Sequence, residues 1–116
     1  MSAKESLIQK AYENFNARNI PQILETMTPD VHWPKAFEGD FVTGKEQVSQ
    51  YWTRQWSEIN PIVIPTKITE NPDGSFLVEI HQTVKDLRGE ILFDGTVFHT
   101  YFFENGLIQK MEISAN

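Results

Sequence analysis

Two side chains that could take part in proton transfer, His99 and Tyr101, lie two positions apart in the stretch VFHTYFF. Side chains with this spacing in a β-strand point to the same face of the sheet. A histidine with an ordinary pKa near ~6.5 exchanges a proton around neutral pH, and a phenol can orient a bound ligand through a hydrogen bond. The pair predicts a general acid or base, His99, beside a ligand-orienting Tyr101. The alternative is a core histidine that is satisfied by Tyr101, Gln82 or the backbone.

The strand that carries this pair is predicted to form a hairpin with the end of the chain, over residues 91–113. Glu104, Asn105 and Gly106 are interpreted as a three-residue turn, because the glycine can adopt the left-handed conformation that such turns require. The predicted cross-strand pairs are Phe103 with Leu107, Tyr101 with Gln109, and His99 with Met111. The side chains that alternation then assigns to the core face are Val97, His99, Tyr101, Gln109, Met111 and Ile113.

A neighbouring strand is predicted from the alternation of apolar and polar residues in FLVEIHQTVK, residues 76–85. This alternation places Gln82 inside and His81 outside. Gln82 could orient a ligand or simply satisfy His99, since a buried amide needs a partner in either case. Asp94 also faces outward in the predicted hairpin, so we expect His81 and Asp94 to be surface or dimer-contact residues.

The most aromatic helix is predicted over residues 43–59, TGKEQVSQYWTRQWSEI, opened by a capping box at Thr43. Trp52 and Trp56 recur at helical spacing on its inner face and could line a pocket for a flat apolar ligand. Filling the core is the alternative for both rings. Arg54 is expected to pair with Glu58 one turn further on.

Length and composition set limits on the possible function. The chain has 116 residues, a net charge of −6 and no cysteine, which predicts one domain over residues 1–116 without disulfides. Its Lys and Arg residues are scattered, which argues against nucleic acid as a partner. Because no apolar run reaches membrane-spanning length and no signal peptide is evident, we expect a soluble cytoplasmic protein. The sequence has no Gly-rich phosphate loop and no convincing metal site among its three histidines, so neither a cofactor nor a metal is expected.

The order of the predicted elements indicates an α+β fold. The predicted elements are a helix over 3–17, a shorter helix from Asn19 that ends at Thr28–Asp30, an extended piece over 31–34, a loop over 35–42, the aromatic helix, and strands over 62–69, 76–85, 91–103 and 107–113. Three helices near the N-terminus can cover one face of the antiparallel sheet that the later strands form.

In this order and spacing the chain resembles the nuclear transport factor 2-like superfamily, and within it the ketosteroid isomerase-like and SnoaL-like branch. The segments that carry the resemblance are Asn16–Asn19, Pro29–Pro34, Thr43–Glu46, Tyr51–Trp56 and the Phe103–Ile108 turn. The resemblance implies a cone-shaped domain with a curved antiparallel sheet wrapped around an apolar pocket. It also implies a homodimer through the outer sheet face, where Phe98 and Phe102 would lie.

The resemblance also suggests roles for individual residues. The position of the isomerase base is occupied by Trp33, which makes steroid isomerase activity by that mechanism unexpected. The position of the tyrosine falls on Ala11 or Tyr12, and that of the sheet acid falls on His99. The chain is therefore expected to bind a small apolar molecule, and to act as an isomerase-, cyclase- or hydratase-like enzyme through His99. A non-catalytic binding module and a homodimeric interaction domain are the alternatives. The expected ligand-binding residues are Tyr12, Trp33, Trp52, Trp56, Gln82, Tyr101 and Met111.

Overall fold

The computed structural model describes residues 3–35 and 39–114. Residues 36–38 of the predicted loop lie outside this range. The elements of the described residues are α1 (Ala3–Asn16), α2 (Ile20–Leu24), β1 (Met27–Pro34), β2 (Phe41–Thr43), α3 (Lys45–Trp56), β3 (Ile59–Glu70), β4 (Phe76–Asp86), β5 (Ile91–Glu104) and β6 (Leu107–Ser114).

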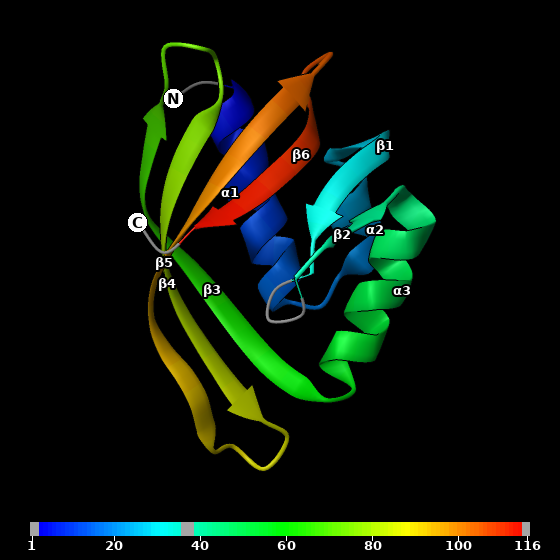
Figure 1. Cartoon of the computed structure of the whole chain (residues 1–116), viewed down its shortest axis with the longest axis vertical. Coiled ribbons are helices and arrows are strands. Elements are labelled where there is room, and N and C mark those ends of the chain that lie inside the picture. Colours follow the sequence, from blue (N-terminus) through cyan, green and yellow to red (C-terminus); the bar gives the residue numbers. More distant parts are fainter. Residues whose placement is uncertain (1–2, 36–38, 115–116) are drawn as a thin grey trace.

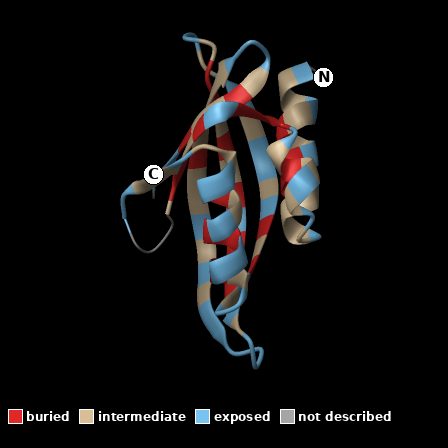
Figure 2. Ribbon diagram, turned by 90° about the vertical axis from the view of Figure 1, so that its right-hand side faces the viewer, coloured by how far each residue is buried: buried red, intermediate tan, exposed pale blue. Residues whose placement is uncertain are grey.

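The strands form one curved sheet in the order β2-β1-β6-β5-β4-β3, with the helices on one side of it (Figure 1). Buried residues concentrate between the sheet and the helices (Figure 2). The α+β fold with a curved sheet and N-terminal helices is therefore confirmed. One pairing departs from the predicted antiparallel sheet, because β1 runs parallel to β6. This pair joins the first strand of the chain to the last, so no local sequence pattern predicts it.

The alternating pattern of β4 is confirmed. Phe76, Val78, Ile80, Gln82 and Val84 are all buried, whereas the side chains between them are exposed or half-buried. Because the strand period is two, this pattern directs Gln82 to the face of the sheet that the helices cover.

The hairpin between β5 and β6 forms where predicted, but its register differs. The turn consists of two residues, Asn105 and Gly106, with φ of 52° and 80°, and Glu104 pairs with Leu107. Asn-Gly favours this tight turn because both residues tolerate a positive φ. A bulge then shifts the register, so that Tyr101 pairs with Met111.

This bulge changes which residues of β6 face the core. Ile108 and Met111 are buried, whereas Gln109 between them is only half-buried, so its predicted core position was wrong. A bulge adds one unpaired residue and reverses the facing of every residue beyond it. Met111 therefore lies on the same face as Tyr101, as predicted. The predicted partners were wrong, because Met111 pairs with Tyr101 and His99 pairs with Ile113.

The N-terminal half differs from the predictions at its element ends. The second helix ends at Leu24, and Thr28–Asp30, predicted to end it, belong to β1. The predicted loop contains β2, which pairs with the end of β1. At the start of α3 the cap residue is Gly44, without a side-chain hydrogen bond; the Thr43 amide instead donates to Gln47 Oε1. Strand pairing holds these residues extended, which overrides their local preferences.

His81 and Asp94 face outward as predicted and also pair with each other, which was not predicted, and the predicted Arg54–Glu58 pair is present. His81 Nε2 lies 2.7 Å from Asp94 Oδ1 on the outer face of the sheet, and both side chains are exposed. Arg54 Nη1 lies 4.0 Å from Glu58 Oε1 on α3. Within the described ranges, none of the helices has the length and apolar character needed to cross a bilayer.

Candidate functional site

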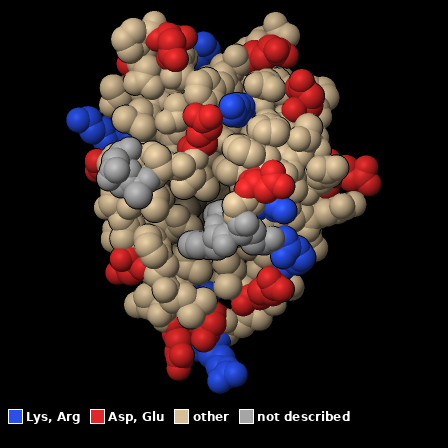
Figure 3. Space-filling view, viewed as in Figure 1, with Lys and Arg blue, Asp and Glu red and all other residues tan. Residues whose placement is uncertain are grey.

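A small cavity lies between the inner face of the sheet and the helices. Its volume is about 50 Å³. This space is smaller than the roughly 150 Å³ cavity that accommodates benzene in a well-studied case. A ligand with one ring therefore needs some of the wall side chains to shift. The face shown in Figure 3 is hollowed near its centre, and positive and negative side chains are scattered around it.

Most of the expected site residues come together in the wall of this cavity. The expected residues that line it are Tyr12, Trp33, Trp52, Gln82, His99, Tyr101 and Met111. Trp56 lies outside the wall and stacks on Trp52, with ring centroids 5.8 Å apart. Tyr51 and Gln55 also line the cavity, although neither was among the expected site residues. Their positions on the inner stripe of α3, one helical turn apart, were the available signal.

Three of these residues form a buried hydrogen-bonded chain. Tyr101 donates its hydroxyl hydrogen to the Tyr12 oxygen over 2.7 Å, and the Tyr12 hydroxyl lies 2.7 Å from His99 Nδ1. His99 and Tyr101 share a face of β5, and Tyr12 comes from the buried side of α1. The partner of His99 is therefore Tyr12, rather than Tyr101, Gln82 or the backbone.

The chain of donors determines which ring nitrogen of His99 carries the hydrogen. Because Tyr12 accepts a hydrogen bond from Tyr101, its own hydroxyl hydrogen is available for His99 Nδ1. Nδ1 is then an acceptor, and in a neutral ring the hydrogen is on Nε2. Among the described residues, no group forms a hydrogen bond with Nε2. This N–H is therefore available to an oxygen atom in the cavity.

Burial determines the charge of these groups. Burial lowers the pKa of His99 to about 3, because the charged ring would lose its hydration without gaining a counter-charge. Burial likewise raises the pKa of both Tyr12 and Tyr101 above the usual value for tyrosine. All three groups are uncharged at neutral pH. The expectation that His99 titrates near neutrality assumed an ordinary pKa, and it does not hold at this depth.

Gln82 is a second polar group in the apolar wall. It lines the cavity and is only 9 % exposed. Its side-chain amide forms no hydrogen bond with any residue that the structure describes, and in particular it forms none with His99. A polar group in such a position can bind a ligand without first breaking a bond within the protein.

Three aromatic rings of the wall pack against one another. The rings of Trp33 and Trp52 meet edge to face with centroids 5.5 Å apart, and Phe15 meets Trp52 in the same way at 5.9 Å. Trp52 is almost completely buried, at 1 % exposure. These contacts keep Trp52 in place between the cavity and the exterior face of α3.

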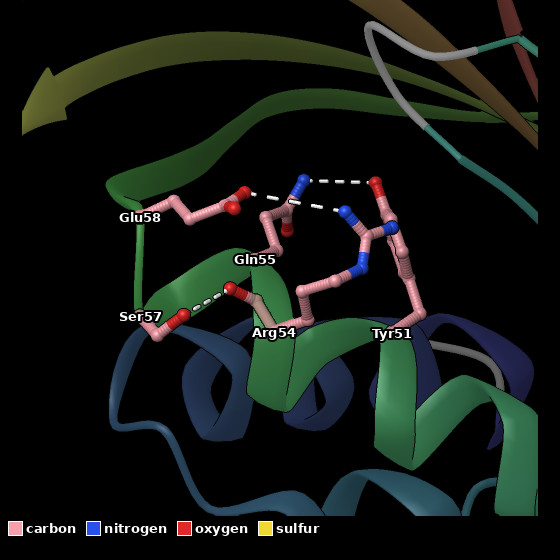
Figure 4. A network of polar contacts seen from close by, with 5 residues as sticks. All are labelled: Tyr51, Arg54, Gln55, Ser57 and Glu58. Atoms are coloured by element: carbon pink, nitrogen blue, oxygen red, sulfur yellow. Dashed lines mark hydrogen bonds and ion pairs between the residues drawn. The ribbon is translucent and has the colours of Figure 1, made fainter.

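A polar network borders the cavity at the end of α3 (Figure 4). Gln55 Nε2 donates to the Tyr51 hydroxyl over 2.8 Å. The Arg54 guanidinium lies 5.6 Å from the centre of the Tyr51 ring and also pairs with Glu58. Tyr51 thus separates the cavity from a surface groove that Lys35 and Arg54 line.

The described residues contain no cluster of three side chains that could hold a metal ion. The wall of the cavity likewise presents no carboxylate among these residues. The polar groups that His99 and Gln82 contribute to the described wall are neutral hydrogen-bond donors, Nε2–H of His99 and the side-chain amide of Gln82.

Solved structures with this fold were found by comparison. A nuclear transport factor 2-like protein of unknown function from Burkholderia pseudomallei has a TM-score of 0.86 and 22 % identity, covering 100 % of this chain and 92 % of that one. TerC, co-crystallised with polyporic acid, has a TM-score of 0.86 and 23 % identity, covering 99 % and 92 %. A candidate polyketide cyclase from Sinorhizobium meliloti has a TM-score of 0.80 and 16 % identity, covering 98 % and 100 %. At these identities the likeness concerns the fold.

The comparison of sequences was more specific about the family. No curated protein matched the chain significantly. The family model described as SnoaL-like domain, however, matches residues 8–111, which include every element from α1 to β6 in whole or in part. This chain therefore belongs to the SnoaL-like family of the nuclear transport factor 2-like superfamily.

Proposed function

We propose that this protein binds a small cyclic carbonyl compound in the cavity and polarises its carbonyl group with His99. The SnoaL-like family and the cyclase-like fold support a ligand-binding, cyclase or isomerase function. The observation that carries the finer proposal is the Tyr101–Tyr12–His99 chain, which ends at an unpartnered Nε2–H. The co-crystallised polyporic acid of TerC further supports a small organic molecule as the ligand.

The expected chemistry is stabilisation of an enolate. A hydrogen bond from Nε2–H to the carbonyl oxygen strengthens as negative charge develops there, and it is effective in a site that excludes water. The hydrogen bond from Tyr12 to Nδ1 polarises the ring further, because linked hydrogen bonds reinforce one another. His99 thus acts as a neutral donor, a role that its low pKa favours. The α-proton of the carbonyl compound would leave to a water molecule or hydroxide ion beside the ligand, because none of the described wall residues is a carboxylate.

Non-catalytic binding is the second candidate function, and one observation favours it. Enolate formation needs a group that accepts the proton, yet the expected base position is Trp33 and no carboxylate lines the described wall. A carrier or sensor would use the same donors to hold a carbonyl compound without converting it.

Hydrogen–deuterium exchange of acetophenone distinguishes the two candidates. If His99 stabilises the enolate, the protein accelerates exchange of the methyl protons in D₂O, and His99→Phe lowers this acceleration by about 100-fold, as for the loss of one oxyanion donor. Proton NMR measures the rate. His81→Phe, on the outer face, is the control and should exchange like the wild type. Binding without accelerated exchange would reject catalysis and leave the carrier function.

We also propose a homodimer through the outer face of the sheet. Phe98 and Phe102 are half-buried there, and Ile64 and Leu92 are 49 % and 59 % exposed. Apolar groups on one sheet surface favour contact with another protein surface. Analytical ultracentrifugation should find a dimer for the wild type and a monomer for Phe98→Asp. A matched change at Leu87, in the β4–β5 turn, should leave the dimer intact. A monomeric wild type would contradict the proposal.

A further inference from the structure

We infer that the cavity selects uncharged ring compounds that carry an acceptor oxygen, and that it rejects their anionic analogues. This inference rests on the proposed binding function and narrows it to a class of ligand. It starts from the wall of the cavity, in which none of the described residues is a lysine, arginine, aspartate or glutamate. The imidazole of His99, which lines this wall, is uncharged because of its burial.

An anion in this wall would lose its hydration without gaining a counter-charge. The effective penalty for burying an unpaired ion is several kilocalories per mole, which neutral donors only partly offset. Arg18, which lies over the Phe15 ring of the wall, does not line the cavity. The arginine of α3, Arg54, does not line it either. It lies over the ring of Tyr51, which forms part of the wall, and it pairs with Glu58 (Figure 4).

The polar atoms of the cavity specify an acceptor on the ligand. His99 offers Nε2–H, and Gln82 offers a side-chain amide that has no hydrogen-bond partner among the described residues. A ketone, quinone or amide oxygen can accept from both groups. A purely hydrocarbon ligand would leave both groups dehydrated and unpaired, at a cost of about 1–3 kcal/mol for each group, so it would bind weakly.

Three probes of nearly the same shape test the inference. Acetophenone, benzamide and benzoate each carry a carbonyl carbon on a phenyl ring, but only benzoate is charged at pH 7. Binding is measured by ¹H–¹⁵N NMR titration, with the side-chain amide of Gln82 as the local reporter. The two neutral probes should bind at least about 100-fold more tightly than benzoate, as expected for several kilocalories of desolvation.

Two variants assign the selectivity to the cavity. Gln82→Leu lacks the reporter amide, so its titration is followed through the indole N–H resonances of Trp33 and Trp52, which line the same cavity. It should weaken acetophenone binding about fivefold to tenfold, the loss of one neutral hydrogen bond, while benzoate stays excluded. Arg54→Gln should leave the preference for neutral probes unchanged, because Arg54 lies outside the wall. Benzoate that shifts the Gln82 amide as tightly as acetophenone does, and still does so in Arg54→Gln, would overturn the inference, because the anion would then bind in the cavity and not in the groove lined by Lys35 and Arg54.

The failure of this inference can be told apart from the failure of the proposed function. If acetophenone and benzoate shift the Gln82 amide with equal affinity, the cavity binds ligands but does not select by charge, and the inference alone is wrong. If no probe shifts any resonance of the cavity wall, the binding function is wrong and the inference fails with it.

Discussion

Replacing Trp52 by alanine is expected to lower the free energy of unfolding by about 3–5 kcal/mol, the range for deletion of a buried aromatic side chain. Trp52 is 1 % exposed and contacts the rings of Trp33, Phe15 and Trp56. Alanine leaves a space that these rigid rings cannot close, so the lost contacts are not replaced. Urea unfolding followed by circular dichroism measures the change.

Two comparisons make this prediction specific. Trp56→Ala should cost less, because Trp56 is only partly buried and lies outside the cavity wall. Added indole should raise the melting temperature of Trp52→Ala but not that of the wild type, since it refills the space that the substitution opens. A loss below about 1.5 kcal/mol, with no response to indole, would show that the surrounding rings collapse into the site.

Lowering the pH from 7 to 5 is expected to remove about 2 kcal/mol of stability through His99 alone. The pKa of His99 is about 3 in the folded protein, against an ordinary value of 6.5 that applies to the unfolded chain. As the pH falls through 6.5, the unfolded chain therefore takes up a proton that the folded protein does not. Stability is complete above the unfolded pKa and is lost as the pH falls toward the folded value.

Urea unfolding at pH 7, 6 and 5 measures this effect. His99→Gln lacks the titrating ring but can still accept a hydrogen bond from Tyr12, so its stability should depend less on pH by about 2 kcal/mol over this range. His32→Gln is the control, because the His32 ring contacts the neutral Thr43 hydroxyl at the protein surface. It should retain the steep dependence of the wild type. Equal pH dependence in the wild type and His99→Gln would mean that the pKa of His99 is not lowered in the folded protein.

Local periodicity accounts for what could be predicted about the fold. The alternation in β4 assigned Gln82 to the inner face and His81 to the outer face, and both side chains lie there. The same strand period placed His99 and Tyr101 on one face of β5. A helical stripe likewise predicted that Trp52 is buried. These features depend on the repeat of the backbone, which neighbouring residues set.

Features that depend on distant partners could not be predicted in this way. The short strand β2 and the extended start of β1 form because they pair with each other and with β6. The register of the last hairpin depended on the choice between a two-residue and a three-residue turn at Asn105 and Gly106, and on a bulge that alternation does not reveal. In each case the energy comes from a partner strand, which overrides the local preference of the segment.

In the candidate site, too, some features follow from local sequence and others depend on distant partners. Strand spacing alone places His99 beside Tyr101, and the family resemblance suggested Tyr12 as a site residue. The contact between Tyr12 and His99, 87 positions apart, exists only because α1 packs against the sheet. That packing also buries the ring, which lowers the pKa of His99 and makes Nε2–H a neutral donor. The sequence determines which residues are present and which face of a strand or helix each one occupies. Hydrogen-bond partners, charge and cavity volume depend on how deeply each side chain is buried, which only the packed structure determines.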